Sequence, residues 1–253
     1  MVTLQPDNNI HWSPEPGIIV QVRKFSAFMK NFHDPGRFHG FATRRATCFT
    51  PGDFIIPFLS LEELKAVNQF KVLKKQIEWM AGRSLVKEMV CATAPEGTKA
   101  WDISIAYREE GAPFLPRYPK IHISITHSGD YAAVALCQHE NRTMGLDLEK
   151  IGPAPDAGFM KLAFTEAERK YMGDDPLKIF RGWTLKEAFL KYIKKGFNES
   201  LHKVEIYPDV ILYKGITAQV NLFCATLGLD YSISLVTGKN HTAELSTTPA
   251  NLL

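Results

Sequence analysis

Two acidic residues, Asp147 and Glu149, stand two positions apart in a run that alternates like a β-strand. Alternate side chains of a strand point to the same face, so the two carboxylates project together. Like charges this close are unfavourable unless a cation lies between them, and their oxygens suit Mg²⁺, which binds one or two carboxylates together with substrate phosphates. The alternative is a solvated strand edge, on which Lys150 or water balances the charges.

A second pair of charged residues, Glu187 and Lys191, stands four positions apart in a strongly helical run. Residues at this spacing share one helix face. Trp183 precedes Glu187 by one turn, so the face is partly apolar. We predict from this a third metal carboxylate and a cation that neutralises phosphate. An ordinary ion pair within the helix is the alternative.

Further candidates lie earlier in the chain. His127 ends a predicted strand at a tight turn, where an imidazole and backbone donors can approach an anion, although a structural histidine is the alternative. Ser128 lacks the surrounding Gly-x-Ser-x-Gly of a nucleophile elbow, so a hydrolase triad is rejected. A helical run carries a basic face that either holds an outlying phosphate or is simply solvated: Lys71, Lys74, Lys75, Arg83 and Lys87.

The elements that position these residues are marked by caps and periodicity. Ser60 with Glu63, and Thr165 with Glu168, have the spacing of a capping box, which begins a helix. Helices are predicted over 69–90 and 180–195, a hairpin over 121–128 and 131–137, and strands over 18–22 and 144–148. From residue 204 the chain alternates as strands and ends in a polar, frayed terminus.

Similar landmarks recur in the same order along the chain. Each capping box is followed by a helix with a tryptophan, Trp79 or Trp183, and then by a strand, containing residues 123–125 or 233–235. We therefore predict an α+β fold, a pseudo-dimer of two similar α+β halves (1–138 and 139–253) with the ligand cleft between them. A chance agreement of common landmarks is the alternative.

Composition limits the class of protein. The chain has 253 residues, of which 45% are hydrophobic and 23% charged, which excludes collagen-like, disordered and coiled-coil proteins. Its net charge of +3 does not indicate a nucleic-acid partner. No apolar run reaches the ~18 residues of a membrane helix, and no secretory signal is recognised. We expect a cytoplasmic protein that binds neither nucleic acid nor membrane.

Several motifs, taken in order, resemble those of the Sfp-type 4′-phosphopantetheinyl transferases. They read Trp-Met-Ala-Gly-Arg at 79–83, Ile-Thr-His-Ser-Gly-Asp-Tyr at 125–131, Gly-Leu-Asp-Leu-Glu at 145–149, Phe-Thr-Glu-Ala-Glu at 164–168 and Trp-Thr-Leu-Lys-Glu-Ala-Phe-Leu-Lys at 183–191. The third and the last motif together are the most specific part of a resemblance that covers residues 60–196. It implies a pseudo-dimer with coenzyme A between its halves, which agrees with the predicted repeat.

The resemblance also implies roles for single residues. It assigns Mg²⁺ to Asp147, Glu149 and Glu187, and the catalytic set to Glu187, Lys191 and Asp147, with Glu187 as the leading base. Contacts with coenzyme A are implied for His127, Lys74, Arg83, Thr126 and Lys191. Glu168 matches the family as well, but its capping role accounts for it.

One departure from the family lies in a predicted loop. Gly111-Ala112-Pro113 stands where relatives often read Gly-Lys-Pro, so a lysine contact with the coenzyme is missing. Arg108, Arg117 or Lys120 could replace that cation. Weaker affinity for the coenzyme is the alternative.

The resemblance implies an enzyme that transfers the 4′-phosphopantetheine arm of coenzyme A to a serine of an apo acyl or peptidyl carrier protein. The reaction is expected to need Mg²⁺ and to release 3′,5′-ADP, with residues 159–161 either docking the carrier or packing in the core. An internal duplication removes the need for a dimer, so we expect a monomer. The alternatives are a Mg²⁺-dependent phosphohydrolase acting on coenzyme A-like substrates and a non-catalytic coenzyme A-binding protein.

Overall fold

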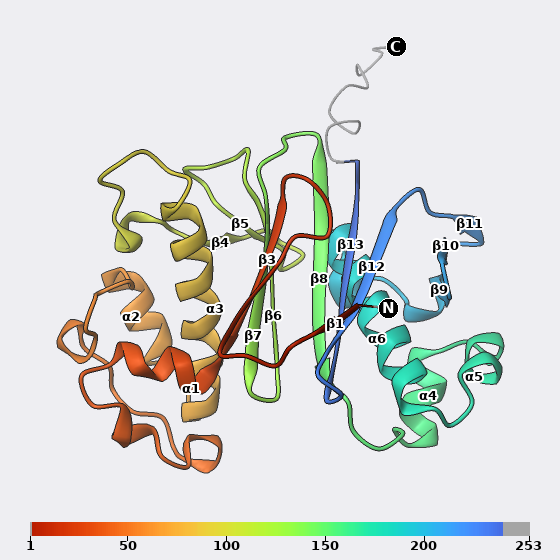
Figure 1. Ribbon diagram of the computed structural model, residues 1–253, viewed down its shortest axis with the longest axis horizontal. Coiled ribbons are helices and arrows are strands. Elements are labelled where there is room, and N and C mark those ends of the chain that lie inside the picture. The colour runs from red at the N-terminus through yellow and green to blue at the C-terminus, as the bar shows by residue number, and fades with distance from the viewer. Residues whose placement is uncertain (1, 240–253) are drawn as a thin grey trace, which may run out of the picture.

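The computed structural model describes residues 2–239, which form two four-stranded sheets flanked by helices (Figure 1). The first sheet has the order β2-β3-β7-β6, and each neighbouring pair is antiparallel. Its strands are β2 (Asn9–Trp12), β3 (Ile18–Lys24), β6 (His122–Ser128) and β7 (Tyr131–Cys137). The predicted hairpin is confirmed as β6 and β7, and the predicted strand at 18–22 lies within β3.

The second sheet has the order β1-β12-β13-β8. Its strands are β1 (Val2–Leu4), β8 (Arg142–Lys150), β12 (Asn221–Leu227) and β13 (Tyr231–Lys239). β1 pairs in parallel with β12, so the start of the chain joins the sheet that is otherwise built from residues after 141. The predicted division at 138/139 falls between β7 and β8 and stays a prediction. The expected frayed end lies outside the described residues.

The same order of elements occurs twice, as β3, α3, β6 and β7 and then as β8, α6, β12 and β13. In the sheets, β7 lies between β3 and β6, and β13 lies between β8 and β12. The predicted match of 123–125 with 233–235 is therefore wrong, because β6 corresponds to β12 and β13 corresponds to β7. The α+β class is confirmed.

An apolar layer joins the two sheets. Alternate residues of β7 explain it, since Ala133 and Ala135 share one apolar cluster with Leu146 and Ile233 of the second sheet. Val134 belongs instead to the core that contains residues of α3. Each sheet is thus covered by its partner sheet on one face and by a long helix on the other, α3 for the first sheet and α6 for the second (Figure 1).

Identifiable features determine where the two long helices begin. α3 (Leu73–Cys91) starts later than predicted because Val72 is extended and bridges to Arg45. α6 (Pro176–Tyr192) starts earlier, because Asp175 caps it and Pro176 occupies its first turn. No helix among residues 2–239 combines the length and hydropathy needed to cross a membrane.

Both predicted capping boxes are confirmed. The hydroxyls of Ser60 and Thr165 accept hydrogen bonds from the backbone N–H groups of Glu63 and Glu168 and begin α2 (Leu61–Val67) and α5 (Glu166–Met172). The remaining α-helices of residues 2–239 are α1 (Phe25–Phe28) and α4 (Ala157–Ala163).

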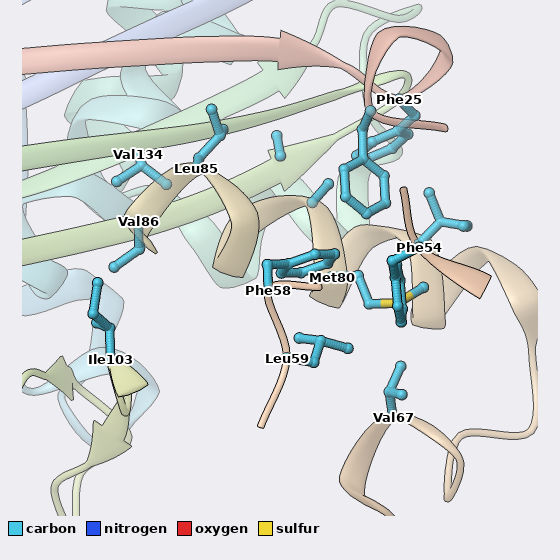
Figure 2. Close-up of a cluster of buried hydrophobic side chains, with 14 of the residues drawn as sticks. Phe25, Phe54, Phe58, Leu59, Val67, Met80, Leu85, Val86, Ile103 and Val134 are labelled. Atoms are coloured by element: carbon cyan, nitrogen blue, oxygen red, sulfur yellow. The ribbon is translucent and has the colours of Figure 1, made fainter. Parts of the chain in front are cut away.

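The segment before α2 supplies aromatic side chains to the core of the first half. Phe25, Phe54 and Phe58 are nearly fully buried, and they surround Met80 of α3 (Figure 2). Phe54 and Phe58 meet edge to face with their ring centroids 5.1 Å apart. The first sixty residues therefore anchor the helix that carries part of the site described below.

Five short strands lie outside the two large sheets. β4 (Ala106–Tyr107) and β5 (Pro113–Phe114) pair with each other, and β9 (Val204–Tyr207), β10 (Val210–Tyr213) and β11 (Ile216–Thr217) form a small antiparallel sheet. Glu199 anchors the small sheet, since its carboxylate accepts hydrogen bonds from Lys203 Nζ at 2.8 Å and from the Tyr213 hydroxyl at 2.5 Å.

These contacts make stability depend on acid pH. The hydrogen bonds from Lys203 and Tyr213 lower the pKa of Glu199 to about 2, below the ~4.3 of an unfolded chain. A lowered folded-state pKa stabilises the protein above the unfolded pKa, and this contribution is lost as pH falls from about 5 to about 2. Urea unfolding at pH 6 and at pH 3 is expected to show less pH dependence for Glu199→Gln than for the wild type. Equal pH dependence in both proteins would contradict this assignment.

Candidate active site

A cavity of about 740 Å³ opens where β6 and β8 meet, between α3 and α6. Seven of the predicted site residues line it: Arg83, Thr126, His127, Asp147, Glu149, Glu187 and Lys191. Lys74 does not line it. Its neighbour Lys75 does, and it pairs with Glu78 at 2.8 Å. Lys74 Nζ lies 3.7 Å from the same Glu78, which lines the cavity, so a contact of Lys74 with the coenzyme stays a prediction.

A close approach of α6 to β8 brings the charged residues together. Gly145, Asp147 and Glu149 alternate along β8 and so face α6. A Cβ atom at Gly145 would lie 2.0 Å from the Ala188 carbonyl oxygen and 2.4 Å from the Tyr192 nitrogen, so only glycine permits this approach. Glu187 and Lys191 flank that contact on α6, which explains why they reach the carboxylates of β8.

Asp147 is only 4% exposed, so the alternative of a solvated strand edge is wrong for this residue. Its Oδ1 accepts hydrogen bonds from Lys191 Nζ at 2.7 Å and from Thr126 Oγ1 at 3.0 Å. Its Oδ2 is buried without a hydrogen-bond partner. A buried carboxylate oxygen without a partner is costly and marks a place where a cation would be stabilising.

Glu149 is half-buried beside the same cavity. Its Oε2 accepts a hydrogen bond from Ser128 Oγ at 2.7 Å, and Ser128 in turn accepts one from the backbone N–H of Lys150. Burial and the negative charge of Asp147 raise the pKa of Glu149, while Ser128, Lys191 and Trp183 oppose the shift. The sequence already argued against Ser128 as a nucleophile, and in the structure its hydroxyl positions the carboxylate of Glu149.

Glu187 is buried, and its Oε1 has no hydrogen-bond partner. Burial raises the pKa of Glu187 to about 7, with further contributions from the negative charges of Asp147 and Glu149 and an opposing one from Lys191. The charges of Asp147 and Glu149 thus act on Glu187, so the three side chains lie in one electrostatic environment.

The carboxylate oxygens of Asp147, Glu149 and Glu187 are of the chemical type that binds a hard cation. As the side chains stand, no three His, Cys, Asp or Glu side chains within residues 2–239 form a group ready to hold a metal ion, and the ammonium of Lys191 contacts Asp147 instead. The free oxygens on Asp147 and Glu187 are nevertheless hard ligands of the kind that Mg²⁺ prefers. The three-carboxylate site stays a prediction.

Two residues of the first half border the cavity from α3 and β6. His127 Nδ1 lies 3.8 Å from Glu78 Oε2. Burial lowers the pKa of His127, and the negative charge of Glu78 opposes this shift. Arg83 is buried, with its guanidinium 3.4 Å from the Trp79 ring centroid and donating to the Tyr107 hydroxyl at 3.2 Å. Arg83 thus has both an aromatic support and access to the cavity.

Other basic and acidic residues of the motifs have structural roles. Lys87 is fully buried, donates to the Phe58 carbonyl at 2.8 Å and pairs with Glu63, so it does not belong to a solvated helix face. Glu168 and Lys186 form a fully buried ion pair at 2.9 Å, which keeps Glu168 outside the cavity. Phe159 packs against Trp183 with ring centroids 5.0 Å apart, in favour of core packing at 159–160.

Comparison with known proteins identifies relatives of one kind. Residues 143–242 match the family model described as the 4′-phosphopantetheinyl transferase superfamily. A 4′-phosphopantetheinyl transferase of Bacillus subtilis is 26% identical over 50% of this chain and 58% of its own. The L-aminoadipate-semialdehyde dehydrogenase-phosphopantetheinyl transferase of Xenopus laevis is 30% identical over 57% of this chain and 52% of its own.

Among solved structures, the holo-[acyl-carrier-protein] synthase of Thermotoga maritima matches with a TM-score of 0.30 and 17% identity, over 59% of this chain and 74% of that one. The chain spans about half the length of the curated relatives it matches. The names of these curated relatives give the enzyme class that the motifs predict. The matched segment contains α6 and all of β8 except its first residue, and so includes the carboxylates of both elements. The resemblance expected from the sequence is confirmed, since residues 143–242 match the model of the 4′-phosphopantetheinyl transferase superfamily and the similar curated proteins are phosphopantetheinyl transferases.

Proposed function

We propose that this protein transfers the 4′-phosphopantetheine arm of coenzyme A to a serine of an apo acyl or peptidyl carrier protein and releases 3′,5′-ADP. The observation that carries the proposal is the convergence of Asp147, Glu149, Glu187 and Lys191 on one cavity. Buried carboxylate oxygens without hydrogen-bond partners are rare in proteins and support a role in binding a ligand. The internal repeat supports action as a monomer.

Charge neutralisation is the main task in phosphoryl transfer. The ammonium of Lys191 is the nearest fixed cation to the carboxylates, and it can contact a phosphate oxygen as it now contacts Asp147. His127 and Arg83 line the cavity and can bind further anionic oxygens of the coenzyme. These residues fix the pyrophosphate for attack by the serine hydroxyl on its β-phosphorus.

Asp147, Glu149 and Glu187 would hold Mg²⁺. When bound, this ion neutralises pyrophosphate charge as a Lewis acid. Glu187 lies where it can take the proton of the attacking serine, and the departing 3′,5′-ADP takes the electron pair of the broken P–O bond. The serine oxygen thereby forms the new bond to phosphorus.

The proposal is tested by mixing the protein with coenzyme A, Mg²⁺ and a panel of apo carriers, followed by mass spectrometry. We expect a mass gain of one phosphopantetheine group on at least one carrier and formation of 3′,5′-ADP. Release of phosphopantetheine without any carrier would indicate a phosphohydrolase. Coenzyme A binding without either product would indicate a non-catalytic protein.

A further inference from the structure

Two cations line the same cavity as Ala112, where the family's lysine is missing. Arg108 lies in the loop between β4 and β5, and Lys194 lies just after α6. Two backbone hydrogen bonds hold the loop, from Arg108 N–H to the Ala112 carbonyl and from Gly111 N–H to the Arg108 carbonyl, both 2.9 Å long. The guanidinium of Arg108 stands 5.1 Å from the Phe114 ring centroid.

The other two cations considered for the missing lysine do not reach the cavity. Lys120 is exposed and pairs with Glu140 at 3.2 Å, and neither Lys120 nor Arg117 lines the cavity. Arg108 is therefore the cation of this loop that remains available to a ligand.

Lys194 has an unusual backbone. Its φ of 57° lies in the left-handed region, which favours glycine. Lys194 N–H donates to the Lys191 carbonyl and Lys195 N–H to the Leu190 carbonyl, the pattern of a Schellman motif that usually carries glycine at this position. Neighbouring Lys191 and Lys195 already supply positive charge to the helix end. Helix capping alone thus gives no reason for a strained lysine here.

The two cations also lack acidic partners. The ion pairs among residues 2–239 involve other cations, and neither Arg108 nor Lys194 forms one. Burial and the nearby charge of Arg108 lower the pKa of Lys194, and the same two cations, after burial, help to lower the pKa of His122. Positive charge that lines a cavity without an ion-pair partner is stabilised when an anion binds there.

We propose that Arg108 and Lys194 together bind a phosphate group of coenzyme A and replace the lysine absent at Ala112. This inference rests on the proposed function, since that function supplies the ligand. The phosphate is either the 3′-phosphate or part of the pyrophosphate. Both are anions of the kind that a guanidinium and an ammonium bind through charge-assisted hydrogen bonds.

Calorimetric titration of coenzyme A and dephospho-coenzyme A into the wild type, Arg108→Gln, Lys194→Gln and the double variant tests the pair. Each single variant is expected to weaken coenzyme A binding about tenfold, and the double variant more. Lys120→Gln is the matched control and is expected to bind as the wild type does. If the two cations bind the 3′-phosphate, the variants should bind dephospho-coenzyme A with the affinity of the wild type. If they bind the pyrophosphate, the variants should bind both compounds more weakly.

Lys194→Gly separates charge from folding. Glycine suits the left-handed backbone, so this variant is expected to melt about 2–4 °C above Lys194→Gln while binding coenzyme A equally poorly. Wild-type affinity in Lys194→Gly or in the double variant would overturn the inference. Affinity that depends on Arg108 and Lys194 in a protein that transfers nothing would overturn the proposed function alone.

Discussion

Asp147→Asn and Glu187→Gln are each expected to slow phosphopantetheine transfer by about 10³-fold or more. Both substitutions keep the shape of the side chain but remove a negative charge from the group of three coupled carboxylates. Asp147→Asn also removes the negative charge that pairs with Lys191 and replaces one of the two carboxylate oxygens, of which Oδ2 has no hydrogen-bond partner. The measurement is the initial rate at which an apo carrier gains mass from coenzyme A.

Glu166→Gln serves as the matched control, because Glu166 is an exposed carboxylate in the first turn of α5. Its transfer rate is expected to equal that of the wild type. All three variants should unfold near the wild-type temperature, since Asp147 and Glu187 are charges buried without full compensation. Wild-type rates in both Asp147→Asn and Glu187→Gln would refute the assignment of the site.

Gly145→Ala is expected to lower the free energy of unfolding by about 3 kcal/mol or more. The added Cβ would meet the Ala188 carbonyl oxygen at 2.0 Å and the Tyr192 nitrogen at 2.4 Å. Both are backbone atoms within α6, so no side-chain rotation relieves the clash and the helix must move away from β8. The displacement carries Glu187 and Lys191 with it, so transfer is also expected to fail.

Gly152→Ala is the comparison variant for this experiment. A Cβ atom there would lie 3.9 Å from the Phe180 ring, which is an ordinary contact. Gly152→Ala is therefore expected to keep nearly the wild-type free energy of unfolding in urea, whereas Gly145→Ala is expected to show the loss of about 3 kcal/mol or more. Equal stability of Gly145→Ala and the wild type would show that α6 does not depend on this close approach.

Local signals in the sequence predict the elements well. The hydroxyl and carboxylate of each capping box, at Ser60 and Thr165, suffice to begin a helix, because the interaction lies within four residues. The start of α3 at Leu73 depends instead on a bridge between Val72 and the distant Arg45. The correspondence of β6 with β12 likewise requires knowledge of strand pairing, which alternation alone does not give.

The site divides in a similar way. Spacing predicts that Asp147 and Glu149 share a strand face and that Glu187 and Lys191 share a helix face, and the structure brings both pairs to one cavity. Spacing does not distinguish Lys74 from Lys75, since one helix position changes the direction of the side chain by about 100°. The burial of Lys87 and the contact of Ser128 with Glu149 arise from tertiary packing and left no local signal.

Three hydroxyl residues of β6 have a consequence for how the molecule can be divided. Ser124 accepts from the Leu146 N–H at 2.9 Å, while Thr126 and Ser128 donate to Asp147 and Glu149. The acidic groups contributed by one half are thus oriented by alcohol groups of the other. A fragment containing residues 139–253 alone would keep Asp147, Glu149 and Glu187 yet lose the hydroxyl groups that orient two of them. The orientation of these acidic groups is therefore a property of the undivided polypeptide.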